Sequence, residues 1–153
     1  MLHPSPLPRY RGGSPIQNQI IAGETSSKVS LFVMTDELDA GDLVGQQDLS
    51  LAGKLDEIFM RLEEAGVELT QHLLEHGLQR VPQNHSEATF CKRRTPGESE
   101  ITAKELETMP AEYLYNKIRM LANPYPNAFI RTADGKKLMI TASHIEDAAC
   151  GQG

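Results

Sequence analysis

A histidine and an aspartate stand in settings where their side chains could act together in catalysis. His3 opens the proline-rich loop HPSPLP, and Asp39 lies in the run LDAGD, shortly after an apolar stretch. A carboxylate beside an imidazole orients the ring and stabilises its protonated form, a pairing that general acid–base catalysis uses. The sequence therefore makes His3 and Asp39 candidates for a catalytic pair, provided that the fold brings the two loops together.

The apolar stretch before Asp39 is expected to form a buried strand over residues 28–35. Its sequence, KVSLFVMT, is apolar on both faces, which is typical of a central strand in a parallel sheet. In such sheets functional side chains gather at the carboxyl ends of the strands, which is where Asp39 would lie. His3 would lie in the same layer if the residues before it form an adjacent strand.

Helical patterns are expected on either side of this strand. Ser14 and Pro15 form a start signal for a short helix, with Ser14 as the N-cap and Pro15 in the first turn. Apolar residues then recur at helical spacing over residues 53–76, which predicts the longest helix. The order indicates an α/β fold class, with residues 1–82 as its first unit.

The amino-acid composition changes over residues 83–109, which we expect to be a linker. Basic residues, proline, glycine and serine are concentrated in its segment TFCKRRTPGES. Pro110 then begins a second helix, and the prolines of NPYP (residues 123–126) end it.

A hairpin is expected after that helix. Residues 128–132 and 136–141 are the candidate strands, and Asp134-Gly135 is a strong turn signal between them. Residues 110–153 thus comprise a helix, a hairpin and a tail from Asp147 that is expected to fray.

Composition limits the classes of protein. A hydrophobic content of 39% with 24% charged residues is that of a folded protein, and a net charge of −6 argues against a broad nucleic-acid-binding face. No signal peptide or bilayer-length apolar run is present, so we expect a cytoplasmic protein that does not bind membranes. Cys91 and Cys150 are expected to be reduced, and no metal site is expected, because His72 and His76 lack a third ligand.

The two loops resemble the formyltransferase family that uses 10-formyltetrahydrofolate. In that family a strand ends in Asn-x-His-Pro-Ser-x-Leu-Pro, a basic or aromatic pair and Gly follow, and a later loop carries Leu-Asp-x-Gly. This chain has LHPSPLPRYRG at residues 2–12 and LDAGD at residues 38–42. The resemblance continues through RRTP (93–96) and NPYPNAF (123–129), so it covers nearly the whole chain.

The resemblance implies a reaction and its residues. A formyl group passes from 10-formyltetrahydrofolate to a primary amine, without a metal. His3 matches the catalytic histidine that stabilises the oxyanion of the tetrahedral intermediate, and Asp39 the aspartate that holds the imidazolium and moves protons through water. The residues expected to bind ligands are Leu38, Asp39 and Ala40 for the folate and Arg9, Tyr10 and Arg11 for the acceptor.

The resemblance also implies the fold. Residues 1–82 would be the C-terminal half of a doubly wound, Rossmann-like formyltransferase domain, followed by a linker helix and the start of a small OB-like β subdomain. In the family an Asn two positions before the histidine also contacts the oxyanion, and Met1 stands there in this chain. We therefore expect an N-terminally truncated member of the family, with exposed apolar surface and a tendency to self-associate.

Two acceptors fit the family motifs. The segment EATFCKRRTP (residues 87–96) looks more like the branch that formylates an amino sugar linked to a nucleotide, and the negative net charge points the same way. The alternative acceptor is methionyl-tRNA. An alternative from another class is a catalytically inactive remnant that serves as an interaction module.

Overall fold

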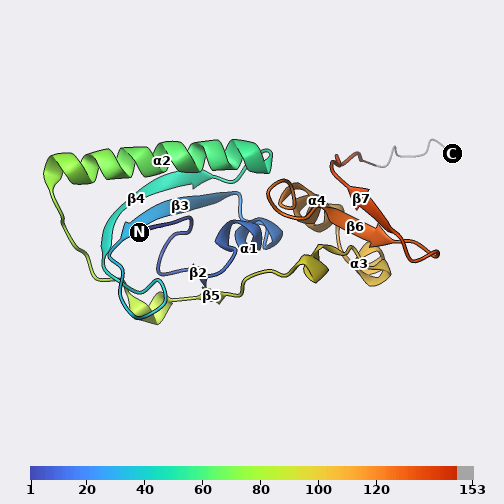
Figure 1. The fold of residues 1–153 in the computed structure, drawn as a ribbon, viewed down its shortest axis with the longest axis horizontal. Helices are drawn as coiled ribbons and strands as arrows, with labels where there is room; N and C mark the ends of the chain where they lie inside the picture. Colours follow the sequence, from blue (N-terminus) through green and yellow to red (C-terminus); the bar gives the residue numbers. More distant parts are fainter. Residues whose placement is uncertain (148–153) are drawn as a thin grey trace.

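The computed structural model describes residues 1–147, and its largest sheet has three strands (Figure 1). β3 (Ser26–Phe32) lies at the centre, between β1 (Leu2–His3) and β4 (Leu43–Ser50), and it runs antiparallel to both. The last four residues of β3 are buried, which confirms the predicted buried strand over residues 28–32, but residues 33–35 lie beyond the strand and Met34 is exposed.

The expected parallel arrangement is wrong for these three strands. Only residues 33–42 connect β3 to β4, whereas a parallel crossover takes about a dozen residues or more. The mixed α/β fold class is confirmed, because helices pack on this sheet. Asp39 thus lies in the loop that joins the two antiparallel strands β3 and β4.

The predicted long helix is confirmed as α2 (Leu55–His76), which runs along the sheet (Figure 1). Its buried face includes Leu55, Ile58 and Leu69, at the spacing that the sequence pattern indicates. Burial of this face in the core that β3 and β4 share explains why the helix forms here.

The short helix α1 (Pro15–Ile21) is also confirmed, but its predicted cap is not. Ser14 has a φ of 51°, and its side chain makes no capping hydrogen bond. Its hydroxyl oxygen instead accepts the backbone N–H of Arg94 at 3.1 Å. Pro15 begins the helix without a side-chain cap, because its ring fixes a helical φ.

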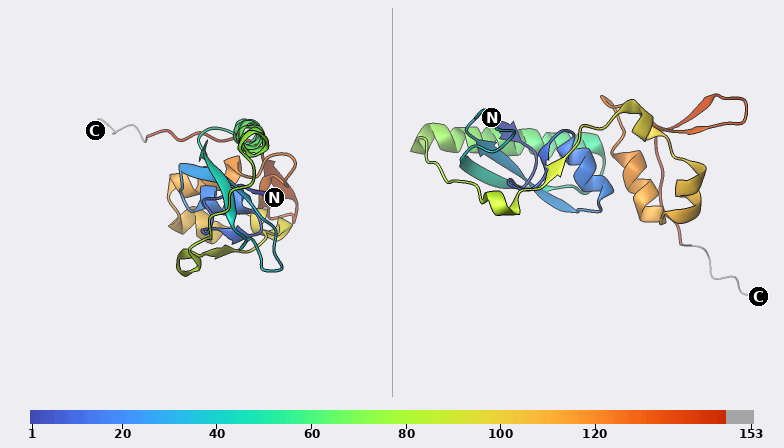
Figure 2. Two further views of the ribbon diagram at one scale, coloured as in Figure 1. Left: turned by 90° about the vertical axis from the view of Figure 1, so that its left-hand side faces the viewer. Right: turned by 90° about the horizontal axis from the view of Figure 1, so that it is seen from below.

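Residues 103–140 form short elements at one end of the molecule, whereas the segment before them runs alongside the first half (Figure 2). The helix predicted after Pro110 and the hairpin predicted around Asp134-Gly135 are both present. The remaining strands and helices are β2 (Arg11–Gly12), β5 (Phe90–Cys91), α3 (Ala103–Thr108), α4 (Ala111–Arg119), β6 (Ala128–Arg131), β7 (Lys137–Ile140) and the 3₁₀ turns His85–Glu87 and Pro96–Ser99.

One cluster of buried side chains joins the two halves. Ile20 and Val29 from the first half belong to the same core as Met120 and Ala128 from the second. The expected linker also lies against the first half, because β5 pairs in parallel with β2. The domain boundaries drawn at residues 82 and 109 stay a prediction.

An apolar hollow of about 570 Å³ lies between α2 and the edge strand β1. Leu2, Leu62, Gly66 and Val67 line it, and Leu2 and Val67 are exposed. This surface is of the kind expected to promote self-association, which itself stays a prediction.

Two expectations fall partly or wholly outside the described residues. The tail that we expect to fray begins at Asp147, so nearly all of it lies outside the described residues. Cys150, which we expect to be reduced, also lies outside them. Within residues 1–147 no helix combines the length and the apolar character that crossing a membrane requires.

Candidate active site

His3 is buried at the end of β1. Its ring meets Phe32 edge to face, with the two ring centres 6.4 Å apart. The Nε2 atom lies 2.9 Å from the carbonyl oxygen of Tyr10. Because a carbonyl oxygen only accepts hydrogen bonds, this contact requires a hydrogen on Nε2.

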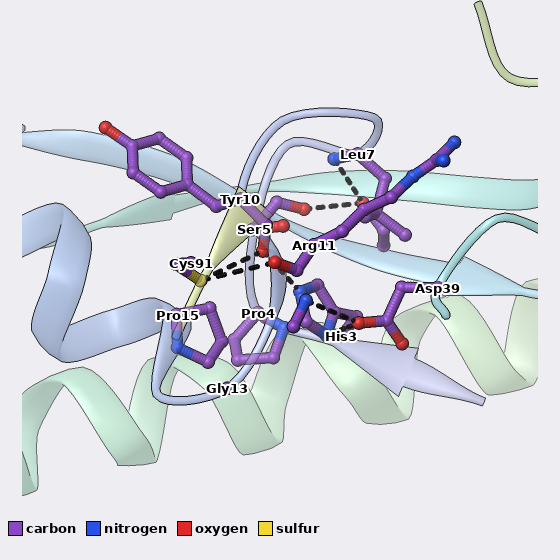
Figure 3. Close-up of polar contacts among 12 residues, drawn as sticks. His3, Pro4, Ser5, Leu7, Tyr10, Arg11, Gly13, Pro15, Asp39 and Cys91 are labelled. Carbon is purple, nitrogen blue, oxygen red and sulfur yellow. Dashed lines mark hydrogen bonds and ion pairs between the residues drawn. The ribbon is translucent and has the colours of Figure 1, made fainter. Parts of the chain in front are cut away.

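Asp39 faces the other nitrogen of this ring (Figure 3). Its Oδ2 atom lies 3.6 Å from His3 Nδ1 and accepts the Gly12 N–H at 2.8 Å. Both ring nitrogens of His3 thus face oxygen atoms, and the Asp39 carboxylate lies within ion-pair distance of the ring. The structure brings the two predicted catalytic residues together.

Two glycines allow the loops to meet closely. Gly12 has a φ of 106°, and a side chain there would collide with the carbonyl oxygen of Cys91 in β5. Gly41, two residues after Asp39, lies against the carbonyl oxygen of Val33. The Val33 N–H also donates to the Asp42 carbonyl at 2.9 Å, which closes the base of the Asp39 loop.

Gly41→Ala is expected to lower the free energy of unfolding by about 1–3 kcal/mol, the usual cost of overpacking. The added carbon would collide with the Val33 carbonyl, which is backbone and cannot turn aside as a side chain can. Urea denaturation measures the change. Gly97→Ala is the control, because its added carbon meets nothing closer than 4.0 Å. Equal stability of the two variants would contradict the close approach.

The predicted acceptor residues separate into two environments. Arg9 and Tyr10 line a hollow of about 470 Å³, together with Phe90 and Lys92. The Arg9 guanidinium and the Tyr10 hydroxyl both donate to Glu24 Oε1 at 2.9 Å. Burial, followed by this hydrogen bond to Glu24, raises the pKa of Tyr10, so its hydroxyl stays protonated at neutral pH.

Arg11 instead points into the protein, with 3% of its surface exposed. Its Nε and Nη2 atoms donate to Gln83 Oε1 at 3.2 and 2.7 Å. This geometry makes Arg11 a residue that fixes the loop, and its direct contact with an acceptor stays a prediction.

Gln83 is a site residue that sequence reasoning missed. It is buried, and its Nε2 donates to the backbone carbonyls of Asp39 at 3.0 Å and Gly41 at 2.6 Å. In the sequence it belongs to a polar run that indicates only a domain boundary. A glutamine carries no chemical signature that would single it out there.

The predicted folate-binding run presents one apolar side chain to solvent. Leu38 is 61% exposed, whereas Asp39 and Ala40 are buried. Met34, in the same loop, is 71% exposed. Within residues 1–147 no three histidine, cysteine or acidic side chains gather in a way that could hold a metal ion.

Comparisons with known proteins connect this geometry to a family. Residues 1–72 match the sequence model of the family described as formyl transferase. The methionyl-tRNA formyltransferase of Moorella thermoacetica is 36% identical over 152 residues, which cover 95% of this chain and 47% of that protein. The chain thus spans about half the length of this curated relative.

Solved structures agree with the sequence match. The structure of methionyl-tRNA formyltransferase from Clostridium thermocellum superposes with a TM-score of 0.80 at 33% identity, covering 91% of this chain and 65% of that one. The N-formyltransferase from Helicobacter canadensis, in complex with folinic acid and dTDP-3-aminofucose, gives 0.64 at 20% identity, covering 78% and 45%, and shows a likeness of fold alone. On sequence and structure together, residues 1–72 of this chain are a segment of the formyl transferase family.

Proposed function

We propose that this chain carries the catalytic pair of an enzyme that transfers a formyl group from a 10-formyltetrahydrofolate donor to methionyl-tRNA. The observation that carries the proposal is the contact between His3 Nδ1 and Asp39 Oδ2 at 3.6 Å, formed by the two loops whose motifs match the family. Buried, preorganised charges of this kind stabilise charge that develops in a transition state.

The two residues have complementary roles in the proposed reaction. Attack of the amine on the formyl carbon forms a C–N bond and places negative charge on the formyl oxygen, and the imidazolium of His3 stabilises that charge. The intermediate then collapses by breaking the bond to the folate nitrogen. Asp39, through a water molecule, accepts the proton that the amine loses and returns one to the folate nitrogen.

The Asp39 loop offers suitable contacts for the donor. The exposed side chains of Leu38 and Met34 stand on the same loop as the carboxylate, and apolar groups beside a polar one suit a flat ring system with polar edges. When bound, the donor supplies the formyl group. Leu38, Asp39 and Ala40 are the residues that we assign to its binding.

Methionyl-tRNA is now the better-supported acceptor. We expected an amino sugar from segment 87–96 and from the negative net charge, but the M. thermoacetica relative and the similar C. thermocellum structure are both methionyl-tRNA formyltransferases. The amino-sugar alternative keeps the support of the H. canadensis fold, whose complex contains a nucleotide-linked amino sugar.

The hollow beside the catalytic pair fits a nucleotide-containing acceptor of either kind. Phe90 is 68% exposed, and Arg9 and Lys92 place cations near it. Exposed aromatic rings with neighbouring cations stack bases and attract phosphates. The hollow adjoins the pair, because the Tyr10 carbonyl that contacts His3 also accepts the Cys91 thiol of β5 at 3.6 Å.

A chimera tests the catalytic part of the proposal. Residues 2–147 of this chain replace the matching segment of the M. thermoacetica enzyme, so that the rest of the relative completes the protein. We expect the chimera to transfer labelled formyl from 10-formyltetrahydrofolate to methionyl-tRNA. A folded chimera with no transfer above background would refute the proposal.

Binding to the chain itself tests the acceptor without influence from the relative. Initiator methionyl-tRNA and dTDP-3-aminofucose are titrated separately against the 153-residue protein. We expect the tRNA to bind more tightly. Saturable binding of the sugar nucleotide without binding of the tRNA would overturn the choice of acceptor in favour of the amino sugar.

A further inference from the structure

We propose that Gln83 is a positioning residue that holds the Asp39 loop in its catalytic geometry. The inference rests on the proposed function, because it assigns Gln83 a role in the same reaction. It starts from one amide side chain that lies between the two loops of the site and hydrogen-bonds to both.

The amide nitrogen of Gln83 holds the backbone on both sides of Ala40. It donates to the carbonyl oxygens of Asp39 and Gly41, and thus uses both of its hydrogens on this loop. Asp39 has a φ of 50°, in the left-handed region, where a residue with a side chain is usually strained. Two hydrogen bonds from a buried donor stabilise the loop in that conformation.

The amide oxygen of Gln83 holds the other loop. It accepts two hydrogen bonds from the buried guanidinium of Arg11. The next residue, Gly12, donates its N–H to the Asp39 carboxylate. Gln83 therefore holds Asp39 at its carbonyl, while the loop that Gln83 anchors through Arg11 holds Asp39 at its carboxylate.

The hydrogen bonds of Gln83 with Arg11 and with the Asp39 loop explain how Gln83 can affect the catalytic pair. The position of Asp39 Oδ2 relative to His3 depends on the loop backbone, which Gln83 fixes, and on the Gly12 N–H, which Arg11 helps to place. A displacement of about 1 Å in a catalytic group can lower a rate by about 100-fold. Loss of the amide donor is therefore expected to reduce kcat without removing a group that touches substrate.

Gln83→Glu separates this role from simple support of the fold. Glutamate keeps an oxygen for Arg11, and the added charge strengthens that pair, but it cannot donate to the carbonyls of Asp39 and Gly41. In the chimera we expect kcat to fall about 10- to 100-fold, with KM for both substrates unchanged within twofold. Gln79→Glu, the same chemical change at an exposed position, is the matched control and should leave kcat unchanged.

A double-mutant cycle identifies the route of the effect. If Gln83 acts through Asp39, adding Gln83→Glu to Asp39→Asn should lower kcat by less than twofold further. The same 10- to 100-fold loss in both backgrounds would overturn the proposal, as would full activity of Gln83→Glu alone.

A measurement that needs no activity keeps this inference distinct from the proposed function. In the 153-residue chain, hydrogen exchange of the Gly12 amide, which donates to the Asp39 carboxylate, is followed by NMR relative to the core amide of Ile58. Gln83→Glu should speed the relative exchange of Gly12 about 10-fold or more, and Gln79→Glu should leave it unchanged. If the wild-type chimera is inactive but this exchange speeds up, the positioning contact stands and the proposed reaction fails; unchanged exchange refutes the contact itself.

Discussion

Asp39→Asn is expected to lower kcat for formyl transfer by the chimera about 10²- to 10⁴-fold, the range that general acid–base groups contribute. Asparagine has nearly the same shape but no negative charge to place opposite the His3 ring at 3.6 Å. In the proposed reaction it could therefore neither stabilise a positive charge on the ring nor accept the proton of the amine. Release of labelled product, measured over a range of donor and acceptor concentrations, gives kcat and KM separately.

The control for this prediction lies in the same loop. Asp36 is exposed, so Asp36→Asn removes the same charge without touching His3, and kcat should stay near that of the parent chimera. His3→Ala should give a loss as large as Asp39→Asn, because the two residues act as one unit. Wild-type turnover by Asp39→Asn in a folded chimera would show that the pair is not catalytic.

Glu105→Gln is expected to lower the free energy of unfolding of the chain by about 1–3 kcal/mol, because it takes the charged partner from a buried lysine, although Glu105 itself is partly exposed. The Lys117 side chain is 4% exposed, and its Nζ atom lies 2.6 Å from Glu105 Oε1. In the variant this ammonium keeps the Glu100 carbonyl, at 2.7 Å, but no carboxylate. Urea denaturation measures the loss, and Glu107→Gln on the exposed side of α3 is the matched control.

The same ion pair gives a pH dependence with a definite sign. Burial by itself raises the pKa of Glu105, but hydrogen bonds from Lys117 and Thr102 outweigh burial and hold that pKa below its usual value of 4.5. The carboxylate therefore stabilises the fold above pH 4.5, and this contribution is lost as the pH falls through the lowered pKa. The stability difference between the wild type and Glu105→Gln should shrink below pH 4.5. A difference that stays constant down to pH 3 would contradict the assignment.

Much of the secondary structure could be predicted because its signals are local. The apolar periodicity of α2 and the Asp134-Gly135 turn each depend on residues within a few positions of one another. β4 was missed because its centre, GQQD, is polar and lacks the alternation of a half-buried strand. α3 was also missed, although Thr102 and Glu105 form a capping box that is readable in the sequence.

The candidate site could also be predicted only in part. The pairing of His3 with Asp39 could be expected from the family motifs, but the parallel-sheet geometry used to explain it was wrong. The inward turn of Arg11 and the role of Gln83 could not be expected, because each is set by a partner about seventy residues away in the sequence. No periodic pattern tells which of Arg9 and Arg11, two positions apart in an irregular loop, is buried.

The parallel pairing of β5 with β2 has a consequence for the order in which the protein matures. Thr89 and Cys91 supply backbone carbonyls to Arg11 and Gly13, and Gln83 lies just upstream of them. During translation the loop of residues 3–13 leaves the ribosome long before these partners do, so the arrangement of His3 and Asp39 is completed late, once residue 91 has emerged. A fragment cut at residue 82, where the composition changes, would keep both His3 and Asp39 but lose the strand and the amide that hold their loops.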